Sequence, residues 1–308
     1  MSAPPAVTTG RPDEVLRRLE LTVTRRLDGL LHGDYRGLVP GHGSEIGEAR
    51  EYSPGDDVRR MDWNVTARSA VPHIRETIAD HELETWLIVD ESASLAFGTA
   101  NTTKRDLAVA AASAIGFLTA RTGNRIGALL LTGRNDRIIP AKQGRDHLLA
   151  LMRNVIGDAQ ADGTGATDLS AGIARLGGIV RRRGAVVIIS DFLSADGWQH
   201  SLKALAVRQD VLAIEVVDPR ELELPRVGVL RVVDPETGQL REVQTNSRKV
   251  RNAYRAAATN QRSQIAATLR AAGTDHLVLR TDGDWLTDLV KFVSLRRERL
   301  DHRKRARA

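Results

Sequence analysis

Hydrophobic positions recur along this chain with two different periods. Three short, continuous apolar runs are typical of strands that are buried on both faces of a sheet: Thr85–Val89, Ile126–Leu131 and Val186–Ser190. A further strand is expected over Val211–Val217. Helical spacing of apolar residues occupies the intervening segments: 103–122, 145–156, 169–182 and 197–207. Because strands alternate with helices, we expect an α/β fold with a mostly parallel sheet covered by helices on both faces.

The N-terminal quarter of the chain follows a different pattern. Residues 1–11 resemble a flexible leader, and apolar residues at helical spacing predict an amphipathic helix from Asp13 to Leu31. A glycine-rich and strongly charged stretch, 37–68, comes next and is long for a structureless loop, so we expect it to be functional or packed on another part of the chain. The segment 73–78 alternates as a half-buried strand does. We therefore separate a helix and charged loop region, 12–71, from the main α/β domain, 72–295.

The C-terminal part of the domain departs from the strand–helix alternation. Segments 228–233 and 240–245 flank the turn-forming run 234–238 and predict a β-hairpin. A helix over about 247–272, a strand over 276–279 and a last helix complete the domain. Either Asp282 or Asp284 would cap that last helix, which runs into a basic tail, 296–308.

The strongest compositional bias of the chain is the basic charge of its C-terminal tail. The chain has 45 Lys plus Arg against 39 Asp plus Glu, a formal net charge of +6. The tail alone holds seven basic and two acidic residues, a net +5, so a nucleic-acid interpretation of the basic pI would rest on the tail. The sequence has no cysteine, which excludes disulfides, thiolate catalysis and cysteine-bound zinc, and no apolar run long enough to span a bilayer.

Polar residues follow two of the apolar runs where an α/β sheet places its ligands, at the carboxyl ends of the strands. Asp90, Ser92 and Ser94 come directly after one run, Asp191 comes after another, and Thr167 lies in a glycine-flanked loop that opens a helix. Thr164, one turn earlier, is the alternative for the threonine position. Two carboxylates and three hydroxyls are hard oxygen donors, which suit Mg²⁺ or Mn²⁺ and suit zinc or copper poorly.

This set of residues resembles the metal-ion-dependent adhesion site of the von Willebrand factor A domain. The resemblance implies that Asp90, Ser92 and Ser94 supply its Asp-x-Ser-x-Ser loop, Thr167 its second loop and Asp191 its third. It implies a bound Mg²⁺ (or Mn²⁺) in which hydroxyls ligate directly and carboxylates act partly through water.

A second motif lies upstream. Gly41-x-Gly43-x-Glu45 and the run from Arg50 to Arg68, with Tyr52-x-Pro54-Gly55-Asp56-Asp57 and Asp62-Trp63 inside it, are similar to the box of the bacterial family known as domain of unknown function 58. Many members carry two N-terminal membrane helices, which this chain lacks, so we expect a cytoplasmic variant. Members are typically encoded beside MoxR-type AAA+ ATPases, and the resemblance implies such an ATPase and an unidentified protein client as partners.

We expect binding rather than catalysis at this site. Hydrolysis would need a positioned base and a leaving-group acid, and position 92 is Ser where a phosphatase of the haloacid dehalogenase type usually has its acid. The main expectation is a non-enzymatic, metal-dependent adaptor. Two alternatives stay open: metal-dependent phosphoester hydrolysis at the same site, or a tail that contacts nucleic acid or an anionic membrane surface.

Two further expectations concern single features. No aromatic residues are interleaved with the basic residues of the tail, so we do not expect DNA or RNA to bind there, although peripheral membrane contact stays open. We expect Trp63 to be a buried anchor of the charged box, and the box to pack on or near the sheet.

Overall fold

A six-stranded sheet forms the centre of the structure. The computed structural model describes residues 11–30, 49–53, 58, 61–69, 71–75, 84–100, 102–133, 135–160, 167–194, 197–233 and 238–305. The strands lie in the order β10-β7-β6-β3-β4-β5, and β5 alone among them is antiparallel to its neighbour. Their bounds are β3 Glu84–Asp90, β4 Arg125–Leu131, β5 Arg137–Lys142, β6 Ala185–Ser190, β7 Asp210–Val217 and β10 Asp275–Arg280. The predicted, mostly parallel α/β sheet is confirmed.

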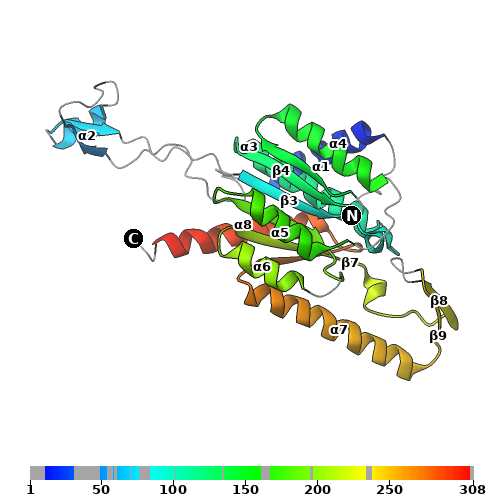
Figure 1. Ribbon diagram of the computed structural model, residues 1–308. Helices are drawn as coiled ribbons and strands as arrows, with labels where there is room; N and C mark the ends of the chain where they lie inside the picture. The colour runs from blue at the N-terminus through cyan, green and yellow to red at the C-terminus, as the bar shows by residue number, and fades with distance from the viewer. Residues whose placement is uncertain are drawn as a thin grey trace.

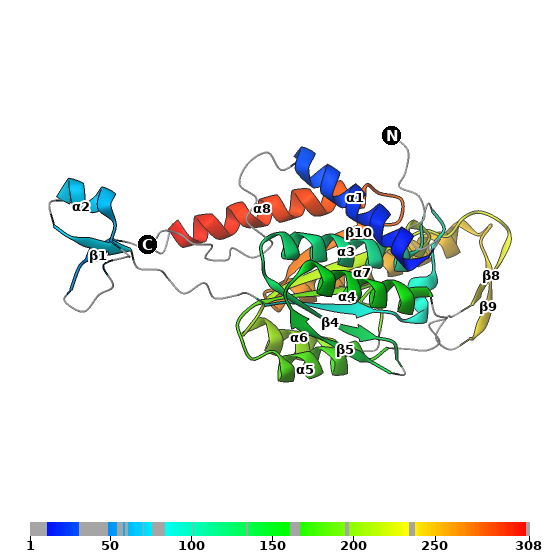
Figure 2. The same cartoon turned by 90° about the horizontal axis from the view of Figure 1, so that it is seen from above.

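Helices cover both faces of this sheet (Figures 1 and 2). One face packs against α1 Pro12–Leu30, α3 Lys104–Arg121, α4 Arg145–Gln160 and α8 Trp285–Arg305. The other packs against α5 Leu169–Ile179, α6 Trp198–Ala206 and α7 Arg248–Ala271. Two hydrophobic cores result, one on each face, as the continuous apolar strands require.

The alanine-rich helix α3 lies at the middle of the first layer. Nearly all of its side chains from Leu107 to Thr119 are buried, because the sheet covers one side and α1, α4 and α8 cover the other. The predicted N-terminal helix is confirmed as α1, whose Val15, Leu19 and Val23 are buried in this layer. α1 therefore belongs to the body of the fold.

The charged stretch contributes a small separate unit. β1 Ala49–Glu51 pairs antiparallel with β2 His73–Arg75, and α2 Trp63–Ser69 packs beside β2. The unit stands clear of the helical layers in both views (Figures 1 and 2), so its described part does not pack on the six-stranded sheet. Trp63 is 69% exposed, so its expected burial is wrong. Its position explains this: it opens α2, and Asp62, not Trp63, faces inward and caps that helix.

The glycine-rich and acidic parts of the motif, 41–48 and 54–57, lie outside the described residues, as do the N-terminal leader and residues 76–83. β2 is the described part of the strand that we expected over 73–78, and it pairs with β1 rather than with the six-stranded sheet. Among the described residues, no helix has the length and apolar character needed to cross a membrane.

Two C-terminal expectations are confirmed. β8 Val229–Val233 and β9 Leu240–Gln244 form the antiparallel hairpin, which lies next to the beginning of α7 (Figure 1). Asp284, rather than Asp282, caps α8, because its carboxylate accepts hydrogen bonds from the backbone and hydroxyl of Thr287. Asp282 instead pairs with Arg280.

Candidate metal centre

Asp90 is the central carboxylate of the candidate site. It ends β3 at the carboxyl edge of the sheet and is 2% exposed. Its Oδ1 accepts hydrogen bonds from the Ser92 backbone N–H at 3.0 Å and from the Thr167 hydroxyl at 2.8 Å. Its Oδ2 accepts one from the Ser190 hydroxyl at 2.6 Å. The structure thus brings Thr167 to Asp90 as predicted, whereas Thr164 lies outside the described residues.

The two serines link Asp90 to Asp191. They flank the first residue of the short 3-10 helix η2, Ala93–Ala96, and their hydroxyl oxygens are 3.0 Å apart. The Ser94 hydroxyl donates to Asp191 Oδ2 at 2.8 Å, and the Leu193 N–H donates to Asp191 Oδ1 at 3.1 Å. All five residues predicted from the sequence therefore form one connected cluster, although Thr167 and Asp191 are far from Asp90 in the chain.

The backbone after Asp191 is held in an unusual conformation. Phe192 has a φ of 56°, in the left-handed region that non-glycine residues rarely adopt. Its N–H donates to the Ser190 hydroxyl at 3.0 Å, and its buried ring packs against Trp198 with centroids 5.3 Å apart. Such strain persists only where the surroundings fix it, and it occurs often at functional sites. Here the strained residue comes directly after Asp191.

Lys104 is part of the site and was missed in the sequence. Its side chain is 0% exposed, and its ammonium donates to Asp191 Oδ2 at 2.7 Å and also to Glu221 Oε1. One signal was available: Lys104 is the first residue of α3, directly after the N-cap Thr103. A cation is unfavourable at that end of a helix dipole, so a buried partner had to compensate for it.

A wider ion-pair network extends from Lys104 to α7. Glu221 lies in the 3-10 helix η3, Pro219–Glu221, and accepts from Arg262 of α7 at 2.9 Å. Arg262 also donates to the Asp191 carbonyl and to Glu215, both at 2.8 Å. His276 Nε2 lies 2.7 Å from the other oxygen of Glu215. α7 is thereby attached directly to the backbone of the loop that follows β6.

The two buried carboxylates have opposite pKa shifts. Burial, reinforced by the nearby Asp191 charge, raises the pKa of Asp90 above its usual value despite its three hydrogen bonds. Burial also acts to raise the pKa of Asp191, but the Lys104 ammonium outweighs it and the pKa is lowered. For Lys104, burial acts to lower the pKa, whereas Asp191 and Glu221 outweigh burial and raise it. Lys104 and Asp191 therefore form a charged pair.

The residues present fit a small, hard divalent cation. All five donors are oxygens, two of them carboxylates, which is the chemistry that Mg²⁺ and Mn²⁺ prefer. For an octahedral ion with ligands at about 2.1 Å, adjacent ligand oxygens are ~3.0 Å apart, and the Ser92 and Ser94 hydroxyl oxygens have that separation. Among the described residues no three His, Asp or Glu side chains gather as a metal site, so hydroxyl ligands are essential to this candidate.

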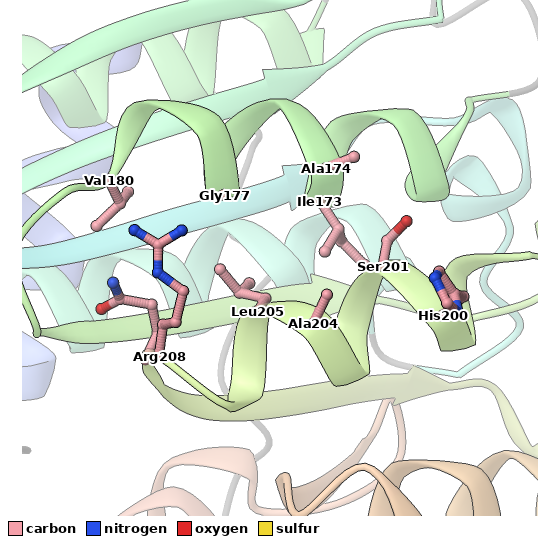
Figure 3. A pocket seen from close by; sticks show the side chains of 10 residues that line it. Ile173, Ala174, Gly177, Val180, His200, Ser201, Ala204, Leu205 and Arg208 are labelled. Atoms are coloured by element: carbon pink, nitrogen blue, oxygen red, sulfur yellow. The ribbon is translucent and has the colours of Figure 1, made fainter.

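Two cavities lie apart from the five donors. One, of about 310 Å³, lies between α5 and α6 and is lined by Ile173 and Leu205 among others. Arg208 lies toward one of its ends and His200 toward the other (Figure 3). The other, of about 340 Å³, lies beside α7 and includes Glu215 and Arg262 of the ion-pair network. Neither includes Asp90 or its hydroxyl partners, so the candidate site is a polar cluster at the sheet edge and not the floor of either cavity.

The fold and the position of this cluster define the class of protein. A mostly parallel sheet with helices on both faces, and a carboxylate–hydroxyl cluster at its carboxyl edge, make this a von Willebrand factor A-like domain. The chain belongs to the family described as protein of unknown function DUF58, which matches residues 48–264.

Several individual proteins are similar to this chain. The "Uncharacterized protein Rv1480" of Mycobacterium tuberculosis is 52% identical over 299 residues, which cover 96% of this chain and 94% of the relative. An aerotolerance-related membrane protein from Bacteroides fragilis is 14% identical, with a TM-score of 0.46 over 69% of this chain and 98% of that one. The SpRpn10 VWA domain is 13% identical, with a TM-score of 0.34 over 68% and 93% of the two chains.

Proposed function

We propose that this protein is a non-enzymatic adaptor that binds a partner protein through a divalent metal ion. Asp90, Ser92, Ser94, Thr167 and Asp191 would hold Mg²⁺ or Mn²⁺. The observation that supports this proposal most strongly is the direct contact between residues from three separate loops: Thr167 meets Asp90, and Ser94 meets Asp191, each at 2.8 Å. Helix caps and turns alone do not require such convergence.

The chain's own residues fix the geometry of the donors. Ser190 and the Ser92 backbone hold the Asp90 carboxylate from two sides, and Lys104 and Ser94 hold Asp191. A bound divalent ion would supply a Lewis acid with coordination positions open to an acidic side chain of the partner. The protein would contribute orientation, and the partner would contribute the final ligand.

Hydrolysis has weaker support at this site. A nucleophilic carboxylate needs a lone pair directed at the substrate, but Asp90 already accepts three hydrogen bonds and is 2% exposed. The other carboxylate, Asp191, is paired with Lys104. Both groups are therefore engaged in holding the cluster together, which suits a binding site.

The proposed partner is a MoxR-type AAA+ ATPase, with an unidentified protein as client, in the bacterial cytoplasm where ATP is available. This part of the proposal rests on the resemblance to the family rather than on geometry. The chain would act as a chaperone-like adaptor that presents the client to the ATPase.

The test measures the affinity of the full chain for a purified MoxR-type ATPase from the same genome, by biolayer interferometry with Mg²⁺ and with EDTA. We expect binding that is lost with EDTA and reduced at least ~10-fold in D90A/S92A, because one carboxylate and one hydroxyl ligand are removed.

Asp168→Ala is the matched control. Asp168 is adjacent to Thr167 but caps α5 through the Ala171 N–H at 2.8 Å and takes no part in the cluster. We expect this variant to bind as the wild type does, with a loss of stability of about 1 kcal/mol. An affinity that EDTA does not change, or that is the same in D90A/S92A as in the wild type, would contradict the proposal.

A further inference from the structure

Lys104 is a cation built into the proposed metal site. Its side chain is fully buried, and both of its ion-pair partners are carboxylates, Asp191 and Glu221. Asp191 Oδ2 also accepts from Ser94, so the ammonium and a predicted metal-binding hydroxyl share one carboxylate oxygen. A metal ion bound to this cluster would therefore share Asp191 with a fixed positive charge.

The ammonium stays charged in this environment. Burial alone would lower the pKa of Lys104, but Asp191 and Glu221 together raise it. The Lys104 ammonium in turn lowers the pKa of Asp191. A fully buried lysine that contacts two carboxylates at ion-pair distance has the geometry of an ionised side chain.

We propose that Lys104 is an internal counter-ion that lowers the affinity of the site for divalent cations and reserves tight metal binding for the complex with an acidic partner. This inference rests on the proposed function. With Asp90, Asp191 and Lys104 charged, the cluster carries −1, a divalent ion brings it to +1, and a partner's carboxylate brings it to zero. Without Lys104 the metal alone would neutralise the two carboxylates, and a further carboxylate would be attracted less.

The other charged groups nearby do not change the comparison between the wild type and a protein without Lys104. Arg262 lies between Glu221 and Glu215, and His276 contacts Glu215, so these groups have partners other than Lys104. They are the same in the wild type and in a Lys104 variant. The difference between the two proteins is one positive charge, which contacts both Asp191 and Glu221.

The experiment titrates Mg²⁺ into metal-free, full-length wild type and K104M by isothermal titration calorimetry. Methionine keeps much of the lysine stem and removes the charge. We expect K104M to bind Mg²⁺ about 10-fold more tightly or better, because a like charge near the ion is removed from a low-dielectric site. Acetate, as a carboxylate probe, should strengthen Mg²⁺ binding by a larger factor in the wild type than in K104M.

K203M is the matched control, because Lys203 is an exposed lysine of α6 and its loss changes the net charge equally. We expect no change in either quantity. If K104M folds only in excess Mg²⁺, as judged by circular dichroism, that result also supports the inference, because the metal then replaces the missing cation.

Five results separate the inference from the proposed function. Binding of Mg²⁺ by K104M but not by the wild type supports the inference and counts against metal-dependent binding by the wild type. Equal or weaker binding by folded K104M overturns the inference and leaves the proposed function intact. Absence of binding in both proteins overturns both. A K104M chain that Mg²⁺ cannot refold overturns the inference and leaves the proposed function intact. Equal effects of acetate on both proteins overturn the part of the inference that concerns the partner's carboxylate.

Discussion

Asp90 and Asp191 show how two buried aspartates in one cluster contribute differently to stability. Both are at most 2% exposed, yet the pKa of Asp90 is raised and the pKa of Asp191 is lowered. The difference comes from Lys104, which contacts Asp191 and not Asp90. Without metal, the Asp90 charge therefore opposes folding, whereas the Asp191 charge favours it.

The sign of each contribution follows from linkage. A carboxyl group with a raised folded pKa stabilises the fold below its unfolded pKa of about 3.9 and loses that contribution as pH rises through the folded value. This is the case of Asp90. A carboxyl group with a lowered folded pKa contributes above about 3.9 and loses its contribution as pH falls through the folded value. This is the case of Asp191.

We therefore predict opposite effects of two isosteric substitutions in EDTA. Asp90→Asn should raise the free energy of unfolding at pH 7, with a difference from the wild type that vanishes toward pH 4. Asp191→Asn should lower it by about 3–5 kcal/mol at pH 7, because Lys104 loses a buried partner. Urea unfolding followed by circular dichroism at both pH values measures each effect. A D90N protein as destabilised as D191N would contradict this account.

Sequence reasoning at the residue scale found the groups that follow strands and missed those that reach the site from elsewhere. Asp90, the two serines and Asp191 were predictable because carboxyl ends of parallel strands meet at one edge. Thr167 lies in the loop that opens α5, and the resemblance to the adhesion site supplied it. Ser190 was not, because it counted only as the last residue of a buried strand, yet its hydroxyl binds Asp90. Glu221 and Arg262 became neighbours only once η3 and α7 were placed by tertiary packing.

At the scale of elements, long periodic segments were predictable and short ones were not. The strands of the six-stranded sheet and the helices that cover it follow the apolar pattern, because burial determines both. α2 is seven residues long and has no buried residue among its members, so no apolar period marks it. Its beginning is set instead by Asp62, whose carboxylate accepts the Asn64 and Val65 N–H groups.

Helix α8 is held to the sheet by a buried arginine, which the net charge of the chain does not reveal. Arg296, the first residue assigned to the basic tail, has a side chain that is 3% exposed. It donates to Asp210 at 2.6 Å and to Asp275 at 2.5 Å, at the beginnings of β7 and β10. It therefore fixes α8 to the amino edge of the sheet and is not part of a solvated tail.

We predict that Arg296→Met lowers the free energy of unfolding by about 2–3 kcal/mol, because it leaves two neighbouring carboxylates without their shared cation. The value is below that of a fully buried pair because both aspartates are about a third exposed. Arg270→Met, at the exposed end of α7, is the matched control and should change stability by less than about 0.5 kcal/mol. If Arg296→Met and Arg270→Met lower the free energy of unfolding equally in urea, the buried ion pairs of Arg296 contribute nothing to stability.

Over the whole molecule, the basic residues are concentrated in particular elements, which the total net charge of +6 does not show. α7 carries six basic residues and no acidic ones over Arg248–Ala271, and one of them, Arg262, reaches the carbonyl of Asp191. Part of the basic excess thus serves the ion-pair network around Asp191 and part anchors α8. The site itself is a compact set of carboxylates and hydroxyls that overall charge does not reveal.

We propose that the three loops at the carboxyl edge of the sheet form one metal-binding site. The most direct measurement is a crystal structure of the full-length protein grown with Mn²⁺, with anomalous diffraction used to locate the ion. We predict an anomalous peak within bonding distance of the Ser92 and Ser94 hydroxyl oxygens, and its loss in D90A/S92A. A peak elsewhere, or an ordered site without any peak, would contradict the account.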